Sequence, residues 1–142
     1  MSASKLRLYH RLQVAAHAVR KAADRVVSEA AEVTTAQVAV LTIVGEGKNV
    51  TQRDVATGLR LNESAVTAMV ARLVRLGLLE RVRSGTDSRA WCLRLSRAGR
   101  ATLQASRGSF AFINARIERE LSQQEIKQLV DCLDRLTATF ED

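Results

Sequence analysis

Apolar residues recur every three to four positions in six stretches of this 142-residue chain, and that spacing predicts six helices. We expect helices over 4–31, from 35 to the glycines at 45 and 47, twice between 51 and 77, over 97–121, and after 122. The first stripe is broken and rich in alanine. The last has nearly the spacing of a coiled-coil seam, with Leu129, Leu133 and Leu136 on one side.

Helix start signals support these boundaries. Thr34 with Gln37, Thr51 with Asp54, and Ser122 with Glu125 each have the spacing of a capping box. Asn62 and Ser96 are favoured N-cap residues ahead of the fourth and fifth helices. Polar residues at these positions accept hydrogen bonds from backbone N–H groups that have no partner inside the helix.

The period changes from helical to alternating after Gly77. Residues 79–83 and 91–95 alternate, and Ser84 to Ser88 between them have the composition of a turn. We therefore expect a two-stranded hairpin with a basic tip directly after the middle helix pair. The fold class is mainly α with a small β-hairpin wing, a winged helix-turn-helix.

The helix that begins after Asn62 has two faces of different character. We expect its inward stripe to comprise Val66, Met69, Val70, Leu73 and Leu76. The outward side is short and hydroxylated, and comprises Ser64, Ala65, Thr67, Ala68, Ala71 and Arg72. Such a face can enter a DNA major groove closely, where Ser and Thr bind base edges or phosphates.

The charge distribution agrees with a polyanionic partner. The chain carries +7 overall, whereas residues 51–100 alone carry +6 and residues 118–142 carry −4. A basic module that coincides with a predicted wing favours DNA over a merely solvated basic face.

Other classes of protein find less support. The sequence has no apolar run of 18 residues and a polar N-terminus, so we expect no membrane segment or signal peptide and a cytoplasmic location. Two distant cysteines do not suggest a disulfide framework. Phosphate loops, metal motifs and nucleophile elbows are missing, so we expect neither an enzyme nor a cofactor. A nonspecific architectural DNA binder stays open as an alternative.

The helix pair and hairpin together resemble the MarR family of transcriptional regulators. About fifty consecutive residues carry the resemblance, and the Asp-x-Arg-Ala wing at Asp87 to Ala90 is its most specific part. The other matching positions are Thr51, Val55, Ala56, Leu59, Leu61, Ser64, Val66, Thr67, Leu73, Gly77, Leu78, Arg81, Leu93, Leu95, Ala98 and Gly99.

The resemblance implies one domain over 1–142, with a winged-helix lobe over 34–100 and a dimerisation region over 4–31 and 101–142. It also implies a homodimer that binds a pseudo-palindromic double-stranded operator, because a two-fold dimer places its two reading helices about one DNA turn apart. Repression is the expected effect, although promoter geometry also allows activation.

The resemblance assigns roles to single residues. Ser64, Ala65, Thr67 and Ala68 face the major groove, and Arg72 meets a phosphate or a base edge. Many relatives have a longer side chain at the position of Ala68, so thymine methyl contacts and DNA shape gain weight here. Arg89 enters the minor groove and Asp87 orients it, or the pair only stiffens the wing. Arg53, Arg81 and Arg83 are candidates for phosphate contacts, with a solvated arginine as the alternative at each position.

The family usually senses small aromatic acids, other lipophilic compounds, or oxidants. For an aromatic or lipophilic effector, the candidate residues are Tyr9, His10, Arg11, His17, Gln37 and Trp91. The two histidines are too few for a metal site, so no metal is expected. Redox sensing through Cys92 is an alternative, whereas Cys132 on the apolar last helix is expected to be a small buried residue.

Overall fold

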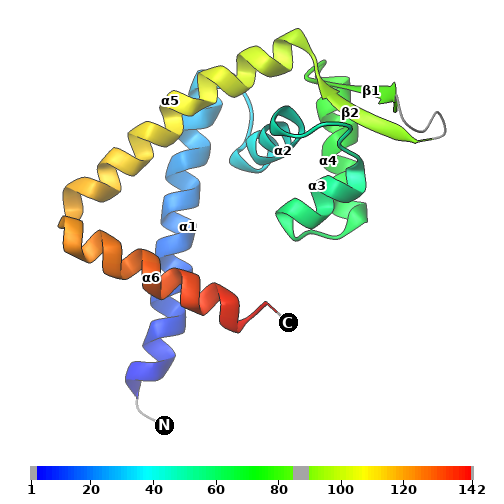
Figure 1. Cartoon of the computed structure of the whole chain (residues 1–142). Helices are drawn as coiled ribbons and strands as arrows, with labels where there is room; N and C mark the ends of the chain where they lie inside the picture. The colour runs from blue at the N-terminus through cyan, green and yellow to red at the C-terminus, as the bar shows by residue number, and fades with distance from the viewer. Residues whose placement is uncertain (1–2, 85–89, 142) are drawn as a thin grey trace.

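The computed structural model describes residues 3–84 and 90–141, with side chains from residue 7 onward. Its helices are α1 (Ala3–Ala31), α2 (Thr35–Glu46), α3 (Gln52–Leu59), α4 (Glu63–Arg75), α5 (Arg97–Glu120) and α6 (Gln123–Thr139). Strands β1 (Leu79–Arg83) and β2 (Trp91–Leu95) lie between α4 and α5. Figure 1 shows a lobe of α2, α3, α4 and the hairpin at one end of a frame of long helices. The predicted fold class is confirmed.

The predicted caps form as expected. Capping boxes close at Thr34, Thr51 and Ser122, where the hydroxyl accepts the N–H of the third helical residue and that residue's side chain accepts the cap N–H. Asn62 and Ser96 cap α4 and α5. Each cap satisfies backbone donors at a helix start, which explains why the boundaries agree with the sequence to within a residue or two.

The lobe contains most of the core. Its fully buried side chains come from all three of its helices and from β1, and include Val40, Leu41, Val55, Val66, Val70, Leu73 and Leu79. The hairpin is antiparallel, with Leu79 opposite Leu95 and Arg83 opposite Trp91. A further bridge joins Val50 to Leu93, whose N–H lies 2.7 Å from the Val50 carbonyl oxygen. The wing is therefore fixed to the segment that precedes α3.

Helices α1 and α5 pack through small residues. Ala23 and Val27 of α1 are buried, as are Ser106 and Ser109 of α5. The Ser109 hydroxyl donates to the Val26 carbonyl at 3.4 Å, across the two helices. Since serine and alanine occupy little volume, the two backbones can approach closely.

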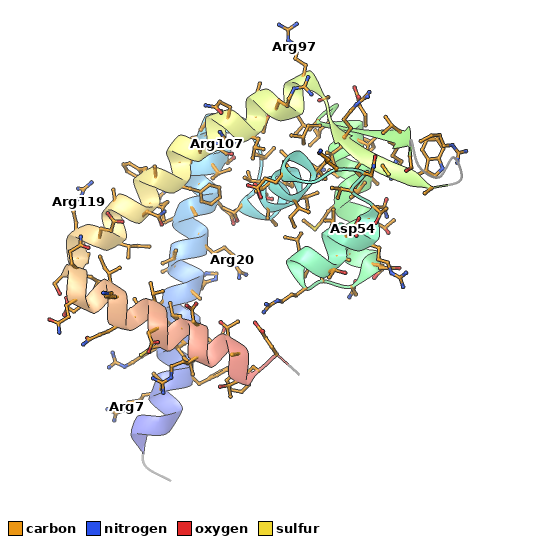
Figure 2. The ribbon with its side chains drawn as sticks, in the orientation of Figure 1. Arg7, Arg20, Asp54, Arg97, Arg107 and Arg119 are labelled. Atoms are coloured by element: carbon orange, nitrogen blue, oxygen red, sulfur yellow. The ribbon has the colours of Figure 1, made fainter. Side chains whose placement is uncertain are left out.

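Helix α6 leaves its apolar stripe uncovered. None of its residues is buried, and Leu129, Leu133 and Leu136 are each 38–43% exposed. Figure 1 shows α6 turning back from the end of α5. The arginines labelled on α5 in Figure 2 include Arg97 and Arg119 at its two ends, and both are exposed. The winged lobe thus buries its own stripes, whereas the last helix does not.

No single helix in the described part of the chain is long and apolar enough to cross a membrane. By length and composition alone, only α1 and α2 taken together across a 67° bend pass that test.

Candidate nucleic-acid interface

Helices α3 and α4 form a helix-turn-helix, and the residue that ends α3 has a left-handed backbone conformation. Arg60 caps α3 at φ 55° and ψ 42°, a conformation that is uncommon for residues other than glycine. Its N–H, and that of Leu61, donate to carbonyl groups in the last turns of α3, which satisfies the helix end. The Asn62 side chain then accepts the Ala65 N–H at 2.8 Å and starts α4.

Helix α4 separates a buried face from an exposed one. Val66, Val70 and Leu73 are fully buried beneath it, and Met69 is half-buried. Leu76 is 48% exposed, so its assignment to the inward stripe was wrong. It is the C-cap, where the chain already turns towards Gly77 at φ 74°, and helical spacing no longer predicts its direction. The predicted outward residues are exposed at Ser64, Thr67, Ala68 and Arg72, and half-buried at Ala65 and Ala71.

A polar cluster joins the exposed face of α4 to α3 and the wing. The Gln52 amide donates to Thr67 Oγ1 at 3.1 Å, and Arg81 Nη2 donates to Gln52 Oε1 at 3.5 Å. Arg53 pairs with Glu63 at 3.7 Å. Together these side chains line a cavity of about 390 Å³, shared with Thr51, Trp91 and Leu93. Three of the predicted DNA-contact residues, Arg53, Thr67 and Arg81, therefore lie around one concave surface.

Gln52 was not among the sequence candidates. Its place at the first position of α3 carries no local signal, because its partners lie 15 and 29 residues away. Only the packing of α3 against α4 and β1 brings the three side chains together.

The two strands of the wing base are linked by side chains directly opposite each other. The Arg83 guanidinium lies 4.0 Å from the centre of the Trp91 ring, a cation–π contact. Arg94 pairs with Glu80 at 2.8 Å. Asp87 and Arg89 lie outside the described residues, so their predicted roles stay predictions.

Asp54 is held as a carboxylate at the start of α3. Hydrogen bonds from the Thr51 N–H and hydroxyl, at 2.9 and 3.0 Å, lower the pKa of Asp54 below its ordinary value. Figure 2 labels Asp54 within the lobe. The carboxylate stays ionised at neutral pH. Its negative charge stabilises the start of α3 through the cap hydrogen bonds and through the favourable interaction with the positive end of the helix dipole.

A single chain does not bring the six effector candidates together. Tyr9, His10, Arg11 and His17 are exposed on α1, and Gln37 is buried with its amide oxygen on the Thr34 N–H at 3.0 Å. Trp91 belongs to the wing, and Figure 1 places the wing far from the N-terminal half of α1. An effector pocket built from these residues stays a prediction.

The two cysteines differ from each other in exposure. Cys92 is buried on β2 at 3% exposure, and Cys132 is exposed on α6, so the expectation that Cys132 is buried was wrong for the single chain. Among the described residues, no element of the chain buries any residue of its helix. Reactive thiols are generally accessible, so burial does not favour Cys92 as an oxidant sensor.

Comparisons with known proteins agree with this geometry. Residues 31–90 match the model of the MarR family. The HTH-type transcriptional regulator BilQ of Clostridioides difficile is 29% identical over 90 residues, which are 63% of this chain and 61% of that regulator. The match thus spans less than two thirds of that relative.

Two solved structures cover nearly the whole chain. The PcaV regulator of Streptomyces coelicolor, in complex with its natural ligand, is 30% identical, with 94% of this chain and 92% of that chain covered and a TM-score of 0.77. The S. aureus MepR–DNA complex is 21% identical, covers 99% of both chains and has a TM-score of 0.83, which shows the shared fold. With the helix-turn-helix, the wing and the match over residues 31–90, these findings show that the chain belongs to the MarR family of winged helix-turn-helix transcriptional regulators.

Proposed function

We propose that this regulator is a homodimeric repressor that binds a pseudo-palindromic operator and leaves it when a small molecule binds. The exposed face of α4 carries the proposal. Its side chains are small, the opposite face of the helix is buried in the core, and Arg53 of α3 and Arg81 of β1 lie next to it. A helix of this kind fits a major groove, and flanking arginines neutralise phosphates. MepR, which shares the fold, was solved on DNA.

The dimer is proposed from the uncovered apolar residues at both ends of the chain. Leu8, Val14 and Val19 of α1 are 43–58% exposed, and α6 has no buried residue. Large apolar side chains that recur along two helices and stay exposed are typical of an interface. A two-fold pairing of these helices would place two copies of α4 about 34–36 Å apart, one helical turn of DNA.

The wing is proposed to hold the duplex from the side. Arg89, with Asp87 as its orienting partner, is assigned to the minor groove through the family resemblance. Arg53, Arg81 and Arg83 are assigned to phosphates. Arg53 and Arg81 both line the concave surface beside α4, which supports the assignment of these two.

A cavity between α2 and α5 is our candidate for the effector. It measures about 420 Å³ and combines apolar side chains such as Leu103 and Phe110 with two cations, Arg100 and Arg107, and one anion, Glu46. Apolar walls with one or two charged groups suit an aromatic acid. PcaV was solved with its natural ligand, which supports a ligand-responsive regulator. Release from DNA needs the ligand to favour the non-DNA geometry by about 1–3 kcal/mol.

Selection of bound duplexes from a random pool tests the proposal. We expect an inverted repeat whose half-sites are about 10 base pairs apart, centre to centre. Arg89→Ala should weaken binding to the selected operator. Arg119→Ala, which removes the same charge at the end of α5 farthest from the lobe, should leave it unchanged. Recovery of unrelated sequences at equal affinity would instead indicate a nonspecific architectural protein.

A further inference from the structure

Both hydroxyl groups on the exposed face of α4 already donate their protons within the protein. Ser64 Oγ lies 2.8 Å from Asn62 Oδ1, and Thr67 Oγ1 lies 2.8 Å from the Glu63 carbonyl oxygen. A carbonyl oxygen can only accept, so the hydroxyl must be the donor in each pair. The Asn62 oxygen is identified by the Ala65 N–H, which also donates to it at 2.8 Å.

Gln52 occupies one of the two remaining acceptor positions of Thr67. Its amide nitrogen lies 3.1 Å from Thr67 Oγ1, and its amide oxygen faces Arg81 at 3.5 Å. This orientation of the amide is forced, because the Thr67 proton is committed to Glu63 and Arg81 can only donate. Thr67 keeps one lone pair and its methyl group for any external partner.

These commitments limit what the two hydroxyls can contact on DNA. Phosphate oxygens, guanine O6 and N7, and thymine O4 are all acceptors, so each would have to displace an existing intramolecular hydrogen bond before it could pair with either hydroxyl. The remaining partners are the amino groups of adenine and cytosine and, for the Thr67 methyl, the 5-methyl group of thymine.

We propose that Thr67 reads a thymine of the operator through its methyl group, and that Gln52 is the positioning residue that holds it in this state. The proposal rests on the proposed DNA-binding function and specifies its base readout. Ser64, under the same constraint, accepts from a base amino group and does not anchor a phosphate. Gln52 also links β1 to the exposed face of α4, because its amide oxygen accepts a hydrogen bond from Arg81.

A methyl-deletion experiment tests the proposal. In the selected operator, each thymine is replaced in turn by uracil, which removes only the 5-methyl group. We expect one position in each half-site at which the wild-type protein loses about four-fold in affinity, the value for one buried methyl-sized group. Thr67→Val keeps a methyl at this place, held by the one rotamer that valine strongly prefers in a helix rather than by Gln52, and should retain the loss. Thr67→Ser removes it and should bind thymine and uracil equally.

Two variants of Gln52 separate positioning from packing. Gln52→Glu keeps the shape and the contact with Arg81 but has no N–H to donate to Thr67, and Gln52→Leu removes both bonds. Both should reduce the thymine–uracil difference while the protein stays folded and bound to the operator. Because this readout is a difference between two bases, a merely structural role of Gln52 would not change it.

Failure of the proposal is distinguishable from failure of the DNA-binding function. Two results would overturn the methyl readout and leave the regulator intact. One is a specific operator without any uracil-sensitive thymine, and the other is a Thr67→Ser variant that keeps the wild-type preference for thymine over uracil. Loss of the thymine preference in Thr67→Val would instead assign the readout to the hydroxyl. The lack of any selected sequence would remove the proposed function itself.

Discussion

Replacing Gly99 with alanine would put a methyl group into a backbone contact between α5 and Leu78, in the segment that joins α4 to β1. A Cβ at this position would lie 2.0 Å from the Leu78 carbonyl oxygen and 3.0 Å from its carbon. The same oxygen accepts the Ser96 N–H at 3.0 Å, in the cap that begins α5. The lobe and the long helix therefore meet where only a hydrogen atom fits.

The magnitude follows from three contributions. The obstacle is backbone and must move by about 1 Å to reach even the shortest tolerated contact, which places the cost at the upper end of ~1–3 kcal/mol for overpacking. Loss of the Ser96 hydrogen bond adds about 1 kcal/mol. Alanine returns about 1 kcal/mol through its better helix propensity. We expect a net destabilisation of about 2–3 kcal/mol, a fall in Tm of roughly 10 °C.

Gly108 provides the matched control on the same helix. It is exposed, and a Cβ there would meet nothing within 4 Å. Gly108→Ala should therefore stabilise the protein by up to about 1 kcal/mol. Urea and thermal unfolding of both variants at equal protein concentration measure the contrast, since dimer stability depends on concentration. Gly99→Ala with a stability equal to that of Gly108→Ala would refute the close-contact argument.

Three further predictions concern a cap, a helix junction and the dimer. Asp54→Asn should lower the free energy of unfolding by up to about 1 kcal/mol at pH 7. Because folding lowers the pKa of Asp54, the stability that its charge contributes is present above the unfolded pKa of about 3.9 and is lost as pH falls through the folded pKa. The gap between the urea midpoints of the two proteins should thus narrow as pH falls below about 3.9, and an unchanged gap would contradict the role of the charge. Asp24→Ala removes the carboxylate that accepts hydrogen bonds from the Thr35 N–H and hydroxyl, at 2.8 and 2.6 Å. It should lower the free energy of unfolding by about 1–3 kcal/mol. A urea midpoint equal to that of the wild type would mean that this contact between α1 and α2 adds no stability. Leu133→Glu should convert the dimer to single chains in sedimentation at micromolar concentration, and an intact dimer would exclude this part of α6 from the interface.

Local signals predicted the elements well. Each capping residue acts within three or four positions of its partner, so Thr34, Thr51 and Ser122 identify helix starts from sequence alone. The alternation at 79–83 and 91–95 likewise defines both strands. The buried stripe of α4 was predicted except at Leu76, where the helix ends and its period no longer applies.

The candidate site was only partly predictable, because its geometry depends on contacts between distant segments. The sequence indicated Thr67, Arg53 and Arg81 as candidates, but no periodicity places Gln52 between Thr67 and Arg81. Trp91 was grouped with α1 as an effector residue, whereas strand pairing sets it against Arg83. Register and packing, rather than local pattern, decide such neighbours.

The central claim is tested most directly by the affinity and stoichiometry of binding to the selected operator at about 150 mM salt. We expect a Kd of about 10⁻⁸ M or tighter, at least about 10³-fold tighter than for a scrambled duplex, with two chains bound to each duplex. Equal weak binding to both duplexes, or one chain on each operator, would contradict a dimeric sequence-specific regulator.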